Sequence, residues 1–212
     1  VKAVQFDDHR QSVLVEIPAA GFAWIPDGTP GVKSVLRKDV ALLAEGNVLR
    51  NEHFEAVINE ATGGLQRFKK HGRAPNRLSQ QLAFRFPREK TVKVVDGDQV
   101  TETKTWYSEM RGTSLTVTCA GPSMGEIVTT GEIIDPSTNT RLATFRQTFR
   151  VWLSRRFLEV DIEITPDKLP EGDPWSNYYG SRFAWNDMTA ALSWSLYGIP
   201  QPQNLERLEN PN

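Results

Sequence analysis

Residues 49–68 read LRNEHFEAVINEATGGLQRF and carry the strongest structural signal in the chain. Polar and apolar residues alternate up to Ile58, which is typical of a strand with one buried face. The next residues, NEATGG at 59–64, include an asparagine and a glycine pair, which tolerate the positive φ of a tight reversal. The extended pattern resumes at Leu65. The stretch therefore predicts a β-hairpin that sets its own register and begins a larger sheet.

The strand pattern continues beyond this hairpin almost to the end of the chain. Alternating or β-branched segments lie at 82–86, 91–95, 100–107, 114–120, 126–134, 141–153, 157–165 and 188–197. Short turns separate most of them, with one turn expected at Gly112. Parallel strands would require crossover helices, which the pattern lacks. We therefore expect an all-β fold: a large antiparallel β-sandwich with a small β segment at its amino-terminal end.

Proline and glycine divide the chain near residue 31. Residues 26–31 read PDGTPG, which favours a linker. Residues 1–31 are then a short β segment and linker, and residues 32–212 are the sandwich domain. Residues 32–45 fit either one helix or a pair of strands.

The composition excludes several classes of partner. The formal net charge is -1, and lysine and arginine form no stripe, so we expect no nucleic-acid partner. No apolar run approaches the roughly 18 residues of a membrane helix, and no signal peptide is visible, so we expect no membrane partner and assign no compartment. The single cysteine, Cys119, is expected as a buried thiol. Because the chain begins at Val1, we expect a processed product or a piece of a longer polypeptide.

Several short motifs occur in the order found in one enzyme family. They are the Thr62-Gly63-Gly64-Leu65 turn, Asn76-Arg77-Leu78, Gln80-Gln81-Leu82, Gly121-Pro122, residues 145–150, residues 156–160 and Arg182-Phe183-Ala184-Trp185. In this order they resemble the carboxy-terminal β-domain of glycoside hydrolase family 38, the α-mannosidases. The resemblance covers residues 48–185 and implies a galactose-mutarotase-like super-sandwich that follows a catalytic barrel.

The same resemblance locates the chemistry elsewhere in the parent enzyme. Retaining glycosidases use a carboxylate nucleophile and a carboxyl acid/base, and in this family a zinc ion also contacts the sugar. The resemblance assigns all of these groups to the amino-terminal barrel. We therefore expect no catalytic residue, no metal ligand and no cofactor in this chain, with zinc only in the parent's catalytic domain. The leading hypothesis is a non-catalytic domain that supports the barrel and contributes to carbohydrate contacts.

Two sets of side chains are candidates for carbohydrate contact, because sugars stack on aromatic rings and accept hydrogen bonds from arginine. Residues 175–187, interpreted as a loop, carry the first set: Trp175, Tyr178, Tyr179, Arg182 and Trp185. One face of the 141–153 strand carries the second set: Arg146, Arg150 and Trp152. Alternatively, the rings cap the open end of the sandwich, and the arginines pair across strands with the acids Glu132, Glu159 and Glu163.

Two other functions stay open at this point. A free-standing sugar mutarotase or epimerase would need a general acid and base over the sugar ring, with His53, His71 and Glu163 as candidates. A lectin-like binding module would instead expose the rings between Trp175 and Trp185 together. If the chain is a piece of a longer one, bare sheet edges would favour self-association.

Overall fold

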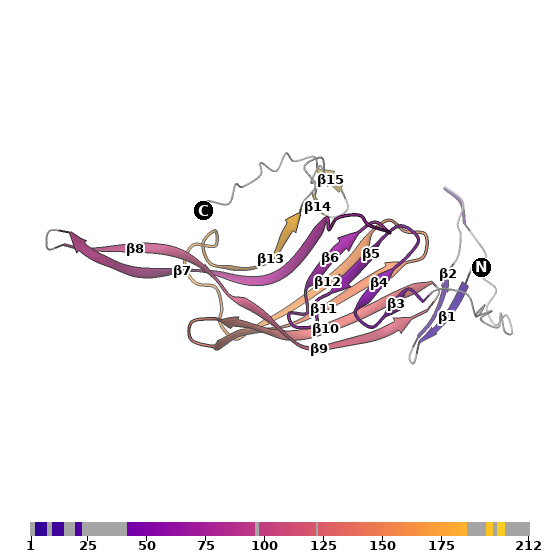
Figure 1. Cartoon of the computed structure of the whole chain (residues 1–212), viewed down its shortest axis with the longest axis horizontal. Coiled ribbons are helices and arrows are strands. Elements are labelled where there is room, and N and C mark those ends of the chain that lie inside the picture. Colours follow the sequence, from indigo (N-terminus) through magenta and orange to yellow (C-terminus); the bar gives the residue numbers. More distant parts are fainter. Residues whose placement is uncertain are drawn as a thin grey trace.

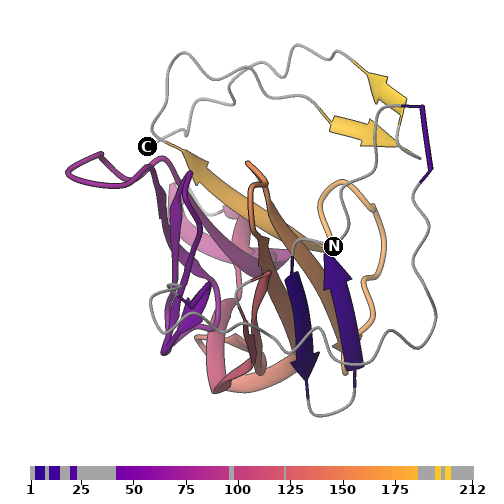
Figure 2. The same ribbon diagram turned by 90° about the vertical axis from the view of Figure 1, so that its right-hand side faces the viewer.

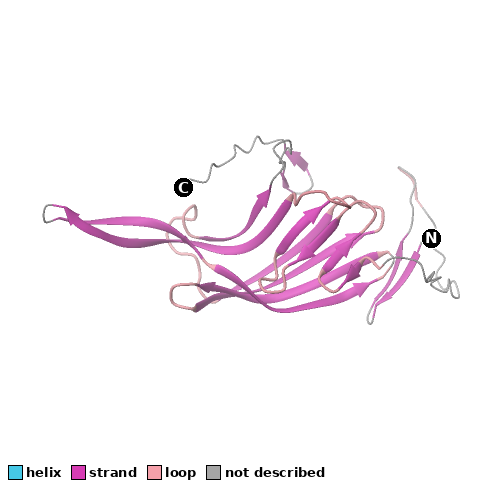
Figure 3. Ribbon diagram, viewed as in Figure 1, coloured by secondary structure: helices cyan, strands magenta, loops and turns pink. Residues whose placement is uncertain are grey.

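The structure is a computed structural model that describes residues 3–7, 10–14, 20–22, 42–95, 98–121, 123–185, 194–196 and 199–201. Within these ranges the chain forms strands and loops and contains no helix, and so no helix that could cross a membrane (Figure 3). Two antiparallel sheets, of four and seven strands, make up the body of the molecule. The predicted all-β antiparallel sandwich is confirmed.

The four-stranded sheet has the order β12-β11-β10-β9. Its strands are β9 (Glu109–Ala120), β10 (Met124–Asp135), β11 (Thr140–Trp152) and β12 (Leu158–Pro166). Along β11 every second side chain points into the core, so Phe145, Phe149 and Val151 are buried. The intervening arginines lie on the outer face.

The seven-stranded sheet has the order β13-β7-β6-β5-β4-β3, with β8 added to β7. Its strands are β3 (Ala44–Glu45), β4 (Val48–Arg50), β5 (Glu55–Ile58), β6 (Leu65–Lys69), β7 (Leu78–Val95), β8 (Asp98–Tyr107) and β13 (Tyr178–Trp185). Figure 2 shows the purple strands of this sheet beside the pink to orange strands of the other. Two small hairpins stand apart: β1 (Ala3–Asp7) with β2 (Arg10–Leu14), and β14 (Trp194–Leu196) with β15 (Ile199–Gln201).

The hairpin expected at 49–68 is the pair β5–β6, in which Ile58 lies opposite Leu65. Its turn places Gly63 at a φ of 77°, in the region that favours glycine. The chain also reverses one step earlier, between β4 and β5. There the side-chain oxygen of Asn51 accepts hydrogen bonds from the backbone of His53 and of the next residue, and this local turn competes with a continuous strand.

Buried side-chain amides join the two sheets to each other and to the β5–β6 turn. Gln80 Nε2 of β7 donates to Gln147 Oε1 of β11 at 2.8 Å and to Ser181 Oγ of β13 at 2.9 Å. Gln147 Nε2 in turn donates to the carbonyl oxygen of Gly63 at 3.0 Å, and Thr129 Oγ1 donates to the same oxygen at 2.8 Å. Every strand in this set is thereby fixed in register against the hairpin.

Three expectations for individual segments are corrected. Residues 82–86 and 91–95 belong to one continuous strand, β7, because β8 pairs along its whole second half. Gly112 lies inside β9 rather than in a turn, and its backbone N–H donates to the carbonyl of Ala61 in the hairpin turn at 2.8 Å. Residues 178–185 form a strand, β13, and not a loop.

Other expectations fall partly or wholly outside the described residues. The linker and domain boundary near residue 31 lie there, as does the segment 32–41. The end of the predicted helix or strand pair is described, and it is the short strand β3. Cys119 is buried, as expected.

The second half of β7 and all of β8 form a long two-stranded arm, running from the pair Arg85–Tyr107 to the pair Val95–Asp98. Figure 1 shows this arm extending beyond the sandwich. At its base, Arg88 of β7 binds the carboxylate of Asp135 and so attaches the arm to the far end of β10.

Candidate functional site

Strand β13 carries four of the five candidates of the first set and pairs with the first half of β7. Its side chains alternate between two faces. Tyr179 faces the core, where its ring stacks on Phe84 with centroids 4.4 Å apart, and Ser181 binds the buried glutamine described above. Tyr178 and Arg182 are therefore on the outer face of the sheet.

On that outer face, aromatic rings and arginines from three strands come together. Arg85 of β7 lies in register with both Tyr178 of β13 and Tyr107 of β8. The Arg85 guanidinium is 5.7 Å from the Tyr178 ring centroid, and that of Arg182 is 4.0 Å from the Tyr107 centroid. Arg85 also donates to the carbonyl of Trp175 at 2.9 Å. We call Arg85, Tyr107, Trp175, Tyr178 and Arg182 the β13 surface.

The charges of the β13 surface are positive. A hydrogen bond with the Tyr178 side chain raises the pKa of Arg85 above its ordinary value. No carboxylate of the described residues forms an ion pair with Arg182. The face is thus equipped with stacking rings and with donors suited to oxygen acceptors.

A hollow of about 290 Å³ lies beside these residues and is lined by the paired strands β7 and β13. The strand register explains it, because Gly180 lies opposite Ala83 and Ala184 lies opposite Ser79. These two pairs of small residues flank Arg182 and leave space on either side of its long side chain. Residues lining the hollow include Ser79, Gln81, Ser108, Arg182 and Ala184.

The remaining candidates of the first set differ in exposure. Tyr179 has its hydroxyl 2.7 Å from the carbonyl oxygens of Leu142 and of Lys168, so this group is engaged inside the protein. Burial and the nearby carboxylate of Asp167 raise its pKa to about 12. In contrast, Trp175 is 83% exposed and Trp185 is 39% exposed. These two rings therefore do not close the core as a cap would.

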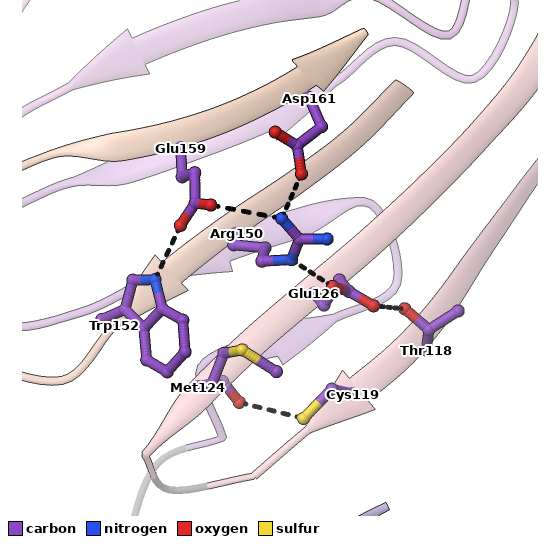
Figure 4. Close-up of polar contacts among 8 residues, drawn as sticks. All are labelled: Thr118, Cys119, Met124, Glu126, Arg150, Trp152, Glu159 and Asp161. Carbon is purple, nitrogen blue, oxygen red and sulfur yellow. Dashed lines mark hydrogen bonds and ion pairs between the residues drawn. The ribbon is translucent and has the colours of Figure 1, made fainter. Parts of the chain in front are cut away.

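The second set of candidates lies on the outer face of the four-stranded sheet. Arg150 of β11 forms ion pairs with Glu126 of β10 and with Glu159 and Asp161 of β12 (Figure 4). These bonds raise the pKa of Arg150 even though its partial burial acts in the opposite direction. Trp152 Nε1 donates to Glu159 Oε2 at 3.1 Å. Arg150 and Trp152 therefore form the cross-strand contacts of the alternative interpretation. Glu159 is one of the expected acids, whereas Glu126 and Asp161 are additional partners.

The polar network around Arg150 extends to a fourth strand, but it does not include the expected acid Glu132. Thr118 Oγ1 of β9 donates to Glu126 Oε1 at 2.6 Å, so polar groups from all four strands are linked. Glu132 instead pairs with Arg141. Arg146 is exposed and lies opposite Glu163 in the register, with no ion pair between the two. It is the most accessible arginine of the second set.

The histidines proposed for a sugar mutarotase do not converge with Glu163. His53 Nε2 is 3.8 Å from Glu52, and the His71 ring contacts the backbone carbonyl of Asn51. Both lie near the β4–β5 turn, whereas Glu163 is on β12. In the part of the chain that the structure describes, no three His, Cys, Asp or Glu side chains are grouped to hold a metal ion.

Sequence reasoning missed two members of the β13 surface, Arg85 and Tyr107. Arg85 lies inside β7 and Tyr107 ends β8, and neither residue type is unusual at such a position. What brings them together is the pairing of β7 with two partners, β13 and β8. That pairing is not encoded locally.

No protein-family model matches this chain, and neither a curated protein nor a solved structure is significantly similar to it. The resemblance to the α-mannosidase β-domain therefore has no support from these comparisons and stays a prediction.

Proposed function

We propose that this chain is a non-catalytic β-sandwich domain of an α-mannosidase-like glycoside hydrolase, which supports the catalytic barrel and contacts carbohydrate through the β13 surface. The observation that carries the carbohydrate contact is the gathering of exposed rings and arginines on one outer sheet face. Aromatic rings offer flat apolar surfaces to sugar C–H groups, and guanidinium groups donate to sugar oxygens. The link to the enzyme family comes from the order of the sequence motifs.

Sugar binding is tested by calorimetric titration of the purified chain with mannose oligosaccharides. Replacing Tyr178 by alanine removes a stacking ring, so we expect the Tyr178→Ala variant to bind about two- to tenfold more weakly. Phe157→Ala is the matched control, because Phe157 is an exposed ring beside the other sheet, and its affinity should equal that of the wild type. Absence of any sugar binding, or equal loss in both variants, would refute the proposed contact.

The proposal that the chain is not catalytic is tested by enzyme assays. The chain is incubated with zinc and an aryl α-mannoside, and separately with α-galactose. We expect no release of the aryl group and no acceleration of anomer exchange. Turnover of the mannoside would contradict the proposal, and faster anomer exchange would favour the mutarotase alternative.

A further inference from the structure

The position of the Arg182 side chain suits the binding of an anionic ligand. Its guanidinium lies over the Tyr107 ring at 4.0 Å, and a ring that stacks on the flat face of a guanidinium leaves the in-plane N–H groups available. These N–H groups form a planar fork that matches the two oxygens of a carboxylate. Because no carboxylate of the described residues pairs with Arg182, the protein itself does not fill that fork within the described part.

The neighbouring hollow suits a small polar molecule. Its volume of about 290 Å³ is at the lower end of the range for ligand sites, which fits one sugar ring rather than a chain of them. Ser79 and Gln81 are among its lining residues and carry a hydroxyl and an amide group. Such groups both donate and accept hydrogen bonds, as a ring bearing several hydroxyls requires.

We propose that the hollow lined by β7 and β13 binds an acidic sugar, a uronic acid residue, whose carboxylate pairs with Arg182 while its hydroxyls contact the polar lining. This inference deepens the proposed carbohydrate contact and rests on it. Arg85, at the same face, adds a second positive charge that favours an anion over a neutral sugar.

The preference of the hollow for a negatively charged sugar is tested by NMR titration of the full chain with methyl glucuronide, methyl glucoside and sodium acetate in separate series. We expect the glucuronide to bind at least tenfold more tightly than the glucoside, because a charge-assisted hydrogen bond is lost with the carboxylate. Acetate should bind more weakly than the glucuronide, since it cannot use the polar lining. Equal affinities for glucuronide and glucoside would overturn the proposed preference for an acidic sugar. Equal affinities for glucuronide and acetate would show that the sugar ring adds nothing to binding and would overturn the proposed sugar site.

The position is tested by three variants. Arg182→Gln removes the charge and should weaken glucuronide binding about tenfold or more. Ala184→Leu should also weaken binding, because it fills the hollow at an exposed position without altering charge. Arg73→Gln is the control, since Arg73 is an exposed arginine in the loop between β6 and β7, and its affinity should be unchanged. Thermal unfolding of each variant confirms that it folds.

The outcomes separate this inference from the proposed function. Tight binding of mannose oligosaccharides with no preference for the glucuronide would overturn the inference and leave the proposed contact standing. Binding of no sugar at all would overturn both. Loss of glucuronide binding in Arg73→Gln to the same extent as in Arg182→Gln would show a non-specific charge effect and would also overturn the inference.

Discussion

At the scale of single residues, two buried side-chain amides connect the hairpin turn to the opposite sheet. Gln80 and Gln147 lie in the core among apolar side chains, where an amide without partners would cost free energy. Both side chains have partners on other strands, and Gln147 reaches the carbonyl of Gly63 in the hairpin turn. The turn and the far sheet are thus joined by hydrogen bonds with defined geometry, which an apolar contact alone would not supply.

Replacing Gln147 by leucine should lower the free energy of unfolding by about 1–3 kcal/mol, because it removes two buried hydrogen bonds at once. Urea denaturation of the Gln147→Leu variant measures the loss. Gln66→Leu is the control, since Gln66 is exposed on β6, and its stability should be close to that of the wild type. Equal stabilities of the two variants would contradict a structural role for the network.

Asp135 offers a test through pH. Burial acts to raise the pKa of its carboxyl, but hydrogen bonds from Ser137 and the charge of Arg88 outweigh burial and hold the pKa below its ordinary value. A carboxyl with a depressed folded pKa adds stability above its unfolded pKa, and that stability is lost as the pH falls through the folded pKa. The wild type should therefore lose stability below about pH 4.

The Asp135→Asn variant should be less stable than the wild type at pH 7, and the difference should shrink as the pH is lowered toward about 3. Urea denaturation at a series of pH values measures both curves. Glu60→Gln, at an exposed position of the hairpin turn, should follow the wild type. A constant difference between Asp135→Asn and the wild type across this range would show that the carboxyl titrates alike in both states.

At the level of the elements, Arg150 links three strands of the smaller sheet on their outer face. One guanidinium contacts carboxylates on both neighbouring strands, Glu126 on one side and Glu159 and Asp161 on the other. The side chains are partly exposed, so each pair contributes less than a buried ion pair would. Their combined effect is to fix β10, β11 and β12 in one register.

Arg150→Met should lower the free energy of unfolding by about 1–2 kcal/mol, because it leaves three carboxylates close together without their cation. Added salt should reduce the loss, since it screens the repulsion among them. Arg146→Met, on the same face of the same strand and without an ion pair to Glu163, is the matched control and should have little effect. A loss in Arg150→Met that is independent of salt would point to packing instead of charge.

At the scale of the whole molecule, the two sheets leave apolar side chains exposed along one side. Strand β12 is the edge of the four-stranded sheet, and β13 ends the order of the seven-stranded one. Ile164 of β12 and Tyr179 of β13 pack on the same core cluster, so the two edges lie on the same side. Farther along them, Ile162 and Phe183 are exposed. Such edges favour pairing with another chain.

We therefore expect the isolated chain to self-associate as its concentration rises, which sedimentation velocity measures. Ile162→Lys should shift the equilibrium toward the monomer, because a charge on an apolar edge opposes pairing. Glu163→Lys changes the neighbouring residue on the opposite face of β12 and should have a smaller effect. A monomer at every concentration would contradict the expectation.

Local sequence patterns are sufficient to predict the strand content of this protein and the place of most strands. The hairpin around Gly63 and the strands β8 to β12 follow from alternation and turn residues, which act over a few neighbours along the chain. The sequence also identified Arg150 and Trp152 as neighbours on one outer face, since side chains two residues apart in a strand point the same way.

Which strands pair, and which side chains are in contact, depends on how distant segments pack in three dimensions. Residues 178–185 have the composition of a loop, and they form β13 because the first half of β7 offers them an edge and a buried partner for Tyr179. The hollow beside Arg182 and its contact with Tyr107 depend on that same pairing. Strand register between distant segments is set by packing and burial across the sheet, so no local pattern can specify it.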